Sequence, residues 1–341
     1  MKLKNFLILA ALTVSTSGAL CADRKSDKVL GKAPDKTADK APDKEPDKKA
    51  DKENRNNRFY VEGDVLYWNA HISSLELSAG KGSIVVETED GITTTFTKEL
   101  DVDPHFKWRA GYRIGAGYQF DSRAWTLGTA WTHFQDRGTK KVTGASNVNT
   151  TKCRVKLDQI DLVLAHNSVS GFCVNFKPFL GIRGAIIRQH LRAFLVTDIL
   201  YAPSTMATST RSLHDSQNYH GIGPLLGSQG VVNLGCGFSL YGTAAAALLY
   251  GKYKVHFHDS DILTPPTSKS FFSKNRKHLH AFDPNITLAL GIRWGVAIYD
   301  CFQIGLKLCF EHQQYFNESH LGANRGDLTF DGGVFGLDLL F

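Results

Sequence analysis

Residues 106–120 read FKWRAGYRIGAGYQF and alternate between two kinds of side chain. Every even position from Phe106 to Phe120 is apolar or aromatic, whereas the odd positions carry Lys, Arg, Gly or Gln. A period of two places these two sets on opposite faces of one β-strand. Aromatic residues gather at both ends of the apolar face, as they do in strands that face lipid. The segment therefore predicts a membrane-spanning strand.

The same alternation recurs along the chain. It is strong at residues 172–187, 285–296 and 302–311, and weaker at 59–70, 124–134, 155–166, 220–232 and 238–253. The chain ends with Phe335, Leu337, Leu339 and Phe341 on one face. Such a terminal strand with a final aromatic residue resembles the ending of bacterial outer-membrane barrels.

The connections between these segments alternate in length. Short ones are predicted near 121–123, 167–171, 233–237 and 297–301, and long ones near 72–104, 135–153, 190–219, 254–280 and 314–328. Short turns on one side and long loops on the other are typical of an up-and-down outer-membrane barrel. A soluble β-sandwich also alternates, but its aromatic residues would fill a shared core. We predict an all-β transmembrane antiparallel barrel of ten strands, or twelve if 83–88 and 93–99 add a hairpin.

The chain divides into three predicted parts. Residues 1–22 have the basic start, short apolar run and small residues of a signal peptide, with cleavage after Ala19 or Ala22. Acylation of Cys21 is the competing interpretation, although Leu20 is large for such a site. Residues 23–57 repeat Asp, Lys, Pro and Ala and predict a disordered linker, because they can bury little apolar surface. The barrel covers 58–341 and places the protein in the bacterial outer membrane.

Other classes of function find little support in the sequence. The net charge of +7 is spread along the chain, with no long basic cluster facing aromatic residues, and a secreted protein rarely meets nucleic acid, so we expect no nucleic-acid partner. Neither a Gly-x-Ser-x-Gly elbow nor a His-Glu-x-x-His motif is present, and Ser, His and Asp are scattered. We therefore predict a protein that is not an enzyme and has no cofactor.

Charged residues occupy the face of the strands that is opposite to the apolar one. Charges of both signs on a lumen wall create a constriction that filters solutes by size and charge. In a narrow barrel the same residues can instead form a plug of salt bridges, and ten strands leave both options open. The predicted pore-lining residues are Glu62, Asp64, Lys107, Arg109, Arg113, Asp161, Lys177, Arg183, Arg293, Lys307, Glu311 and Asp338.

Histidines and cysteines give two weaker hypotheses. His256, His258, His278 and His280 flank one predicted external loop, where they are solvated loop residues or a metal site; without a Cys or carboxylate partner we predict no metal. Cysteines beyond the signal peptide are odd in number, which invites intermolecular bonding in an exported protein. Those near predicted periplasmic turns are candidates for cross-links to envelope proteins or a second copy, with free thiols as the alternative: Cys173, Cys236 and Cys301.

The ordered motifs resemble the pore-forming outer-membrane proteins of the Legionella major-outer-membrane-protein type, a family expanded in Chlamydia-related bacteria. They include FYVEGDVLYW at 59–68, GYRIG at 111–115, WTHF at 131–134, IDL at 160–162, KPFLGIRG at 177–184, GIGP at 221–224, YG at 241–242, LLYG at 248–251, LGIRW at 290–294 and EHQ at 311–313. The likeness covers residues 58–341 and leaves out the linker. It implies a porin, with outer-membrane lipid and small solutes or ions as partners. The alternative is a structural or adhesive envelope protein that acts through its loops and cysteines.

Overall fold

The computed structural model describes residues 58–73, 75, 81–87, 93–99, 104–120, 125–143, 147–169, 174–201, 205–264, 269–299, 302–321 and 325–341. The predicted signal peptide and linker lie outside these residues. No helix in the described part of the chain is long and apolar enough to cross a membrane.

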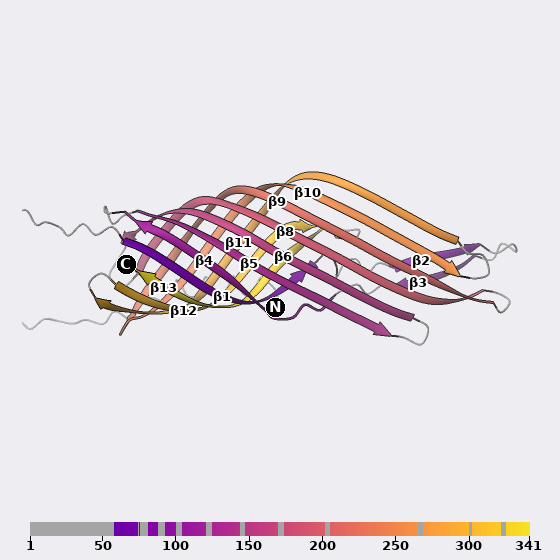
Figure 1. Ribbon diagram of the computed structural model, residues 1–341, viewed down its shortest axis with the longest axis horizontal. Coiled ribbons are helices and arrows are strands. Elements are labelled where there is room, and N and C mark those ends of the chain that lie inside the picture. The colour runs from indigo at the N-terminus through magenta and orange to yellow at the C-terminus, as the bar shows by residue number, and fades with distance from the viewer. Residues whose placement is uncertain are drawn as a thin grey trace, which may run out of the picture. The chain divides into compact units, whose positions relative to one another are not determined.

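Ten antiparallel strands close into one barrel, which confirms the predicted fold class (Figure 1). Around the wall their order is β6-β5-β4-β1-β13-β12-β11-β10-β9-β8, and pairing of β6 with β8 closes the ring. The strands are β1 (Arg58–Ile72), β4 (Arg109–Gln119), β5 (Trp125–Thr143), β6 (Asn147–His166), β8 (Val174–Tyr201), β9 (Thr205–Gly235), β10 (Phe238–Thr264), β11 (Lys269–Tyr299), β12 (Phe302–Ser319) and β13 (Gly326–Leu340). A short strand, β7 (Ser168–Val169), pairs with β8. The first and last strands pair with each other, so the wall has no free edge there.

The predicted extra hairpin exists but does not enter the wall. Strands β2 (Lys81–Glu87) and β3 (Thr93–Glu99) pair with each other, for example Val86 with Thr94. They form a separate two-stranded sheet. The alternative of twelve wall strands is therefore wrong, because a hairpin adds to a barrel only when it pairs with strands on both sides.

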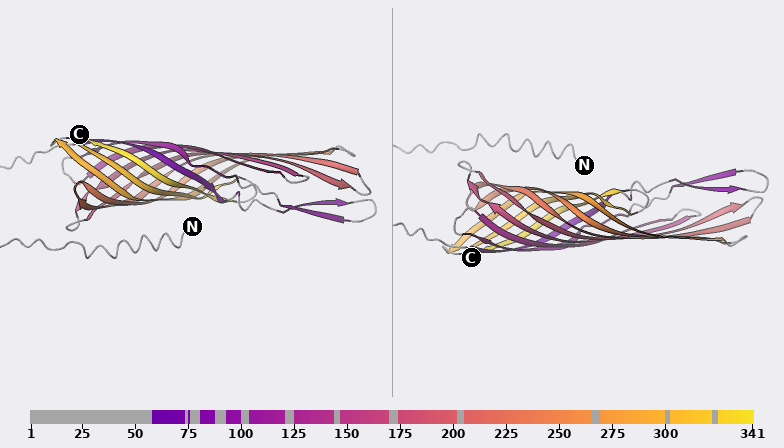
Figure 2. Two further views of the ribbon diagram at one scale, coloured as in Figure 1. Left: turned by 90° about the horizontal axis from the view of Figure 1, so that it is seen from below. Right: turned by 90° about the horizontal axis from the view of Figure 1, so that it is seen from above.

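Several segments that we predicted as long loops are strand extensions. Most of 135–153, 190–219 and 254–280 belongs to paired strands, and β9 and β11 each contain 31 residues. Figure 2 shows ribbons projecting beyond the closed part of the wall at one end. Antiparallel pairing satisfies the backbone groups of these segments even where both faces are polar. The loop prediction was wrong here because it looked for an apolar outward face, whereas the extensions of β8 and β10 carry cations outward and apolar residues such as Leu191 and Val255 inward.

The outer face of the wall is apolar toward the short turns. Ile222, Leu226 and Phe282 are 62%, 63% and 65% exposed, respectively. An apolar surface that encircles a barrel is the surface that lipid covers. We define this surface as the apolar belt, which also contains Phe59, Val65, Tyr67, Trp108, Ile114, Trp131, Ile160, Ile182, Tyr250, Leu290, Leu308, Phe310 and Phe335.

The backbone conformation of one short turn explains why it contains two glycines. Strands β9 and β10 are joined through Gly235, Cys236 and Gly237, whose φ angles are 99°, 51° and 81°. Positive φ angles are the conformation that glycine adopts without steric cost. The turn holds Cys236 at the surface as a free, exposed thiol.

Candidate pore lining

The predicted pore-lining residues do not all reach the barrel interior. All but Lys107 lie on wall strands; Lys107 precedes β4 and is exposed. Arg109 begins β4 with a side chain that is 55% exposed and lies 3.8 Å from Asp136. Asp161 and Arg183 oppose each other on neighbouring strands, and Lys177 is half-buried on β8. The remaining residues gather in a connected charged cluster.

Lys307 joins the carboxylates of three positions near the short-turn end of the barrel. Its Nζ lies 2.8 Å from Asp64, 3.3 Å from Glu62 and 3.7 Å from Asp338. Asp338 in turn lies 3.2 Å from Arg293, whose side chain is 45% exposed. These contacts link β1, β11, β12 and β13. Arg293 is the solvent-exposed member at the end of the cluster.

Deeper in the barrel, Arg113 forms a forked ion pair with Glu311. Its two terminal nitrogens donate to the carboxylate at 3.0 and 2.7 Å, and Nε donates to Thr132 at 3.0 Å. Asp64 lies 3.6 Å from the same guanidinium. Since β4 and β12 are not neighbours, this pair crosses part of the lumen.

Arg183 makes a second crossing. Its guanidinium donates twice to Asp161 at 2.8 Å, and its Nη1 donates to Asn285 and, at 3.0 Å, to Thr287. Asn285 and Thr287 belong to β11, whereas Arg183 belongs to β8. One arginine thereby fills space between separate parts of the wall.

The lumen is also bridged by neutral residues that sequence reasoning missed. Gln313 Nε2 and the Tyr315 hydroxyl both donate to Gln159 Oε1, each at 2.5 Å. Their strands, β12 and β6, stand opposite each other in the order of the wall. Hydrogen bonds therefore span the barrel. The alternation of inward and outward residues along β6 and β12 could have placed these three side chains inside the barrel. It does not reveal that they contact one another across the lumen.

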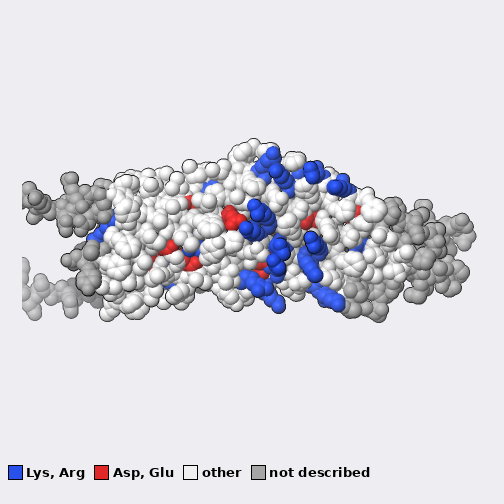
Figure 3. Space-filling model, in the orientation of Figure 1, with Lys and Arg blue, Asp and Glu red and all other residues white. Residues whose placement is uncertain are grey.

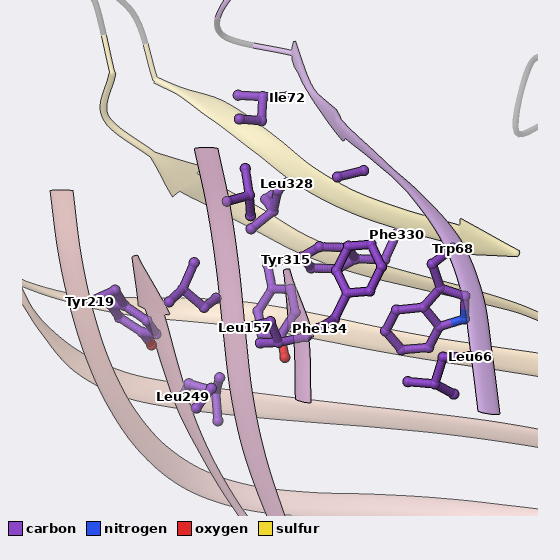
Figure 4. Close-up of a cluster of buried hydrophobic side chains, with 14 of the residues drawn as sticks. Leu66, Trp68, Ile72, Phe134, Leu157, Tyr219, Leu249, Tyr315, Leu328 and Phe330 are labelled. Atoms are coloured by element: carbon purple, nitrogen blue, oxygen red, sulfur yellow. The ribbon is translucent and has the colours of Figure 1, made fainter. Parts of the chain in front are cut away.

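An aromatic layer lies beside this bridge (Figure 4). The ring centroids of Phe134 and Phe330 are 5.4 Å apart. The ring centroid of Trp68 lies 5.6 Å from that of Phe134 and 5.8 Å from that of Phe330. All three side chains have 0% exposure. They come from β5, β13 and β1 and point inward together, as Figure 4 shows with Leu66, Leu157 and Tyr315. We call Trp68, Phe134 and Phe330 the aromatic layer; water has no access to it.

Above this layer, the end of β12 is held inside the barrel. Gln217 donates to the backbone carbonyl of Glu318 at 2.6 Å and to its carboxylate at 2.9 Å, and Gln189 donates to the same carboxylate. The Ser319 hydroxyl donates to Gln189 at 3.1 Å, and the His320 backbone N–H donates to Gln217 at 2.6 Å. These bonds fasten residues 318–320 to β8 and β9.

Glu318 makes the stability of the barrel depend on pH. Burial raises the pKa of its carboxyl to about 8, and the charge of Asp283 adds to this effect. The pKa of Glu318 is higher in the folded state than in the unfolded state. The stabilisation that Glu318 contributes is therefore fully present below the unfolded value of 4.5 and decreases as pH rises toward 8. We expect the free energy of unfolding to fall by up to about 1.4 kcal/mol per pH unit in this window. Urea unfolding of wild type and Glu318→Gln at pH 5 to 9 measures it.

The variant removes the titrating carboxyl but keeps its shape. We therefore expect Glu318→Gln to lose this part of the pH dependence, while Asp259→Asn, at an exposed ion pair with Arg211, keeps the wild-type profile. Parallel profiles for wild type and Glu318→Gln would contradict a buried titration at Glu318.

The four histidines do not converge. In the paired strands, His256 opposes Arg276, His258 opposes Lys274, and His278 opposes Lys254. Cationic neighbours disfavour a bound cation, and the described residues contain no group of three or more His, Cys, Asp or Glu with metal-binding geometry.

The cysteines fall into two groups. Cys153 and Cys309 are buried free thiols, and Cys236 is exposed. The other two candidates for cross-links, Cys173 and Cys301, lie outside the described residues. The intermolecular disulfide stays a prediction.

One family model matches the part of the chain that forms the barrel. A family model described as "Legionella pneumophila major outer membrane protein precursor" matches residues 53–341. None of the curated proteins matches this chain.

The solved structures that match this chain include outer-membrane proteins of low identity and low TM-score. The outer membrane protease OmpT from Escherichia coli is 8% identical, with 83% of this chain and 96% of that chain covered and a TM-score of 0.42. Ail, the attachment invasion locus protein of Yersinia pestis, is 11% identical, with 84% and 99% covered and a TM-score of 0.23. A Pseudomonas aeruginosa FadL homologue is 8% identical, with 84% and 90% covered and a TM-score of 0.29. At these TM-scores nothing about their activities transfers to this chain.

Proposed function

Because the chain belongs to the Legionella major outer membrane protein family, it is a protein of the outer membrane, and we propose that its interior forms a narrow pore for small solutes or ions. The charged cluster around Lys307 and Arg113 carries this proposal. It brings both signs of charge together on the lumen wall, as a charge-selective constriction requires.

The pore of this proposal is closed at rest. A ten-stranded wall encloses little more space than its own side chains fill. The aromatic layer has no exposed surface, and a hydrophobic constriction excludes water and therefore ions. Opening requires displacement of these rings and of residues 318–320, so we expect rare openings of low conductance.

Lipid and small solutes are the partners that this location provides. The apolar belt contacts outer-membrane lipid, and the solutes are small because the constriction is narrow. No catalytic step and no cofactor form part of it.

A second candidate function follows from the same aromatic layer. If the rings never move, the protein is a structural or adhesive envelope component that acts through its long external strands. Cross-linking through the exposed Cys236 would belong to this role.

Single-channel recording of refolded protein in a planar bilayer, with a salt gradient, tests the pore. We expect brief, small current steps in the wild type. Arg293→Gln removes a half-exposed positive charge beside Asp338, so we expect its reversal potential to shift toward cation preference.

Arg276→Gln is the matched control, because Arg276 is an exposed residue that opposes His256 on the projecting strands. We expect it to keep the wild-type reversal potential. A folded barrel without conductance in either protein favours the second candidate. Equal shifts in both variants would mean that Arg293 does not act from the lumen.

A further inference from the structure

Beyond the apolar belt, the outer face of the wall turns from aromatic to basic. One row of paired residues at the edge of the belt contains Trp131, Ile160, Ile222, Tyr250 and Phe282. Rows farther from the short turns pair cations with one another: Arg137 with Arg154, Arg154 with His190, Lys152 with Arg192.

We call this surface the basic band. Figure 3 shows Lys and Arg gathered over one part of the visible face, while another part is largely white. The band comprises the outward-facing residues Arg137, Lys152, Arg154, Lys156, Arg188, His190, Arg192, Lys252, Lys254, Lys274 and Arg276, which are exposed or partly exposed.

The basic band lacks balancing acids. Asp158 lies at its lower edge, where it already contacts His133 at 2.6 Å and Lys156 at 3.2 Å. Within the described part of the chain, no carboxylate pairs with Arg154 or Arg192. Like charges that oppose each other across strands are destabilising, so an anion that binds between them would stabilise this surface.

A pocket concentrates these charges. It has a volume of about 420 Å³ and is lined by Arg137, Gly138, Thr139, Lys152, Cys153, Arg154, His190 and Arg192. Burial and the neighbouring Arg154, Arg192 and Arg188 lower the pKa of His190, which reflects the density of positive charge. Arginine forks match the oxygens of a phosphate group.

The height of the pocket restricts the kind of anion. Arg154 precedes the belt residue Ile160 by six positions on β6, which is about 20 Å along a strand and about 15 Å along the axis of a tilted barrel. The headgroup layer of a phospholipid bilayer is only about 5–8 Å thick on each side. A phospholipid phosphate therefore stays below the pocket, whereas phosphates on an extended sugar headgroup reach it.

We propose that the pocket between β5, β6 and β8 binds a phosphate on the headgroup of an outer-leaflet glycolipid. The apolar belt holds the acyl chains of the same lipid below the basic band. This site lies on the outer face of the wall and is independent of whether the lumen conducts.

The test is binding of lipopolysaccharide with phosphorylated core sugars to the purified full-length protein in non-ionic detergent. We expect the double variant Arg154→Gln with Arg192→Gln to bind at least about tenfold more weakly than wild type, because two charge-assisted contacts are lost. The matched control, Lys107→Gln with Arg325→Gln, removes the same charge at exposed positions outside the pocket and should bind like wild type. Heat-dependent electrophoretic mobility verifies that each barrel is folded.

Competition experiments with other lipids identify the chemical class of the ligand. We expect dephosphorylated lipopolysaccharide and phosphatidylglycerol to compete poorly with the phosphorylated form. Wild-type affinity in the pocket variant would overturn the proposal, as would equal binding of the dephosphorylated lipid. Stronger competition by heparin, a soluble polyanion, than by the glycolipid would also overturn it.

Discussion

Replacing the aromatic layer with alanine is expected to turn a nearly closed barrel into an open channel. Trp68, Phe134 and Phe330 fill the lumen with 0% exposure, and their removal leaves a water-accessible gap beside the charged cluster. A barrier lowered by about 1.4 kcal/mol already raises ion flux about tenfold, and the loss of several rings should exceed this. We expect Phe134→Ala with Phe330→Ala to give long, resolved current steps in planar bilayers.

The control for this variant is Trp131→Ala with Phe310→Ala, which removes two belt residues that are 40% and 45% exposed. We expect its conductance to equal that of the wild type. Each core substitution also costs about 3–5 kcal/mol of stability, so folding must be verified by heat-dependent mobility before recording. If the folded core variant stays silent, the rings do not gate a pore, and the structural role becomes the better explanation.

The strands were predictable where alternate residues face lipid and the lumen, because the first must be apolar and the second can be polar. Residues 106–120 carry this contrast at every position, and β4 forms there. The extensions of β8 to β11 lie beyond the apolar belt, where the alternation is reversed: cations face outward, and inward residues such as Leu191, Tyr253 and Val255 are buried. In residues 205–219, for example, polar residues occur on both faces, with His214 and Ser216 on one and Asp215 and Gln217 on the other. A search for strands with an apolar outward face therefore ends too early, although inward residues such as Leu191 and Tyr253 pack in the buried cluster.

The closure of the lumen was harder to predict than its charge. The inward face of β1 carries Glu62 and Asp64 and continues with Leu66 and Trp68. Because the outward face is apolar as well, residues 65–68 lose the alternation that would identify the inner side. The sequence therefore revealed the charged layer but not the aromatic layer above it. Which inward residues meet across the lumen depends on strand order and register, and local patterns contain neither.

The charged cluster should also be the most sensitive point for stability. Arg113 neutralises Glu311 and Asp64 within the barrel, and both carboxylates are buried. Removing one partner of a buried ion pair leaves an unpaired charge, which costs about 3–5 kcal/mol. We expect Arg113→Leu to lower the free energy of urea unfolding by this amount, as measured by tryptophan fluorescence in lipid vesicles. Trp68 is a suitable reporter, because the Arg113 guanidinium lies 5.9 Å from its ring.

A double-mutant cycle separates the ion pair from the loss of packing. Combining Arg113→Leu with Glu311→Leu removes both charges, so we expect the double variant to be more stable than the sum of the single losses predicts, by about 2 kcal/mol. The matched pair on the outer face, Lys156 and Asp158, is 3.2 Å apart but partly exposed, and it should give a coupling below about 1 kcal/mol. Equal couplings at the two sites would mean that water reaches Arg113 as freely as it reaches Lys156. The lumen would then be open at rest, and the aromatic layer could not be the element that closes it.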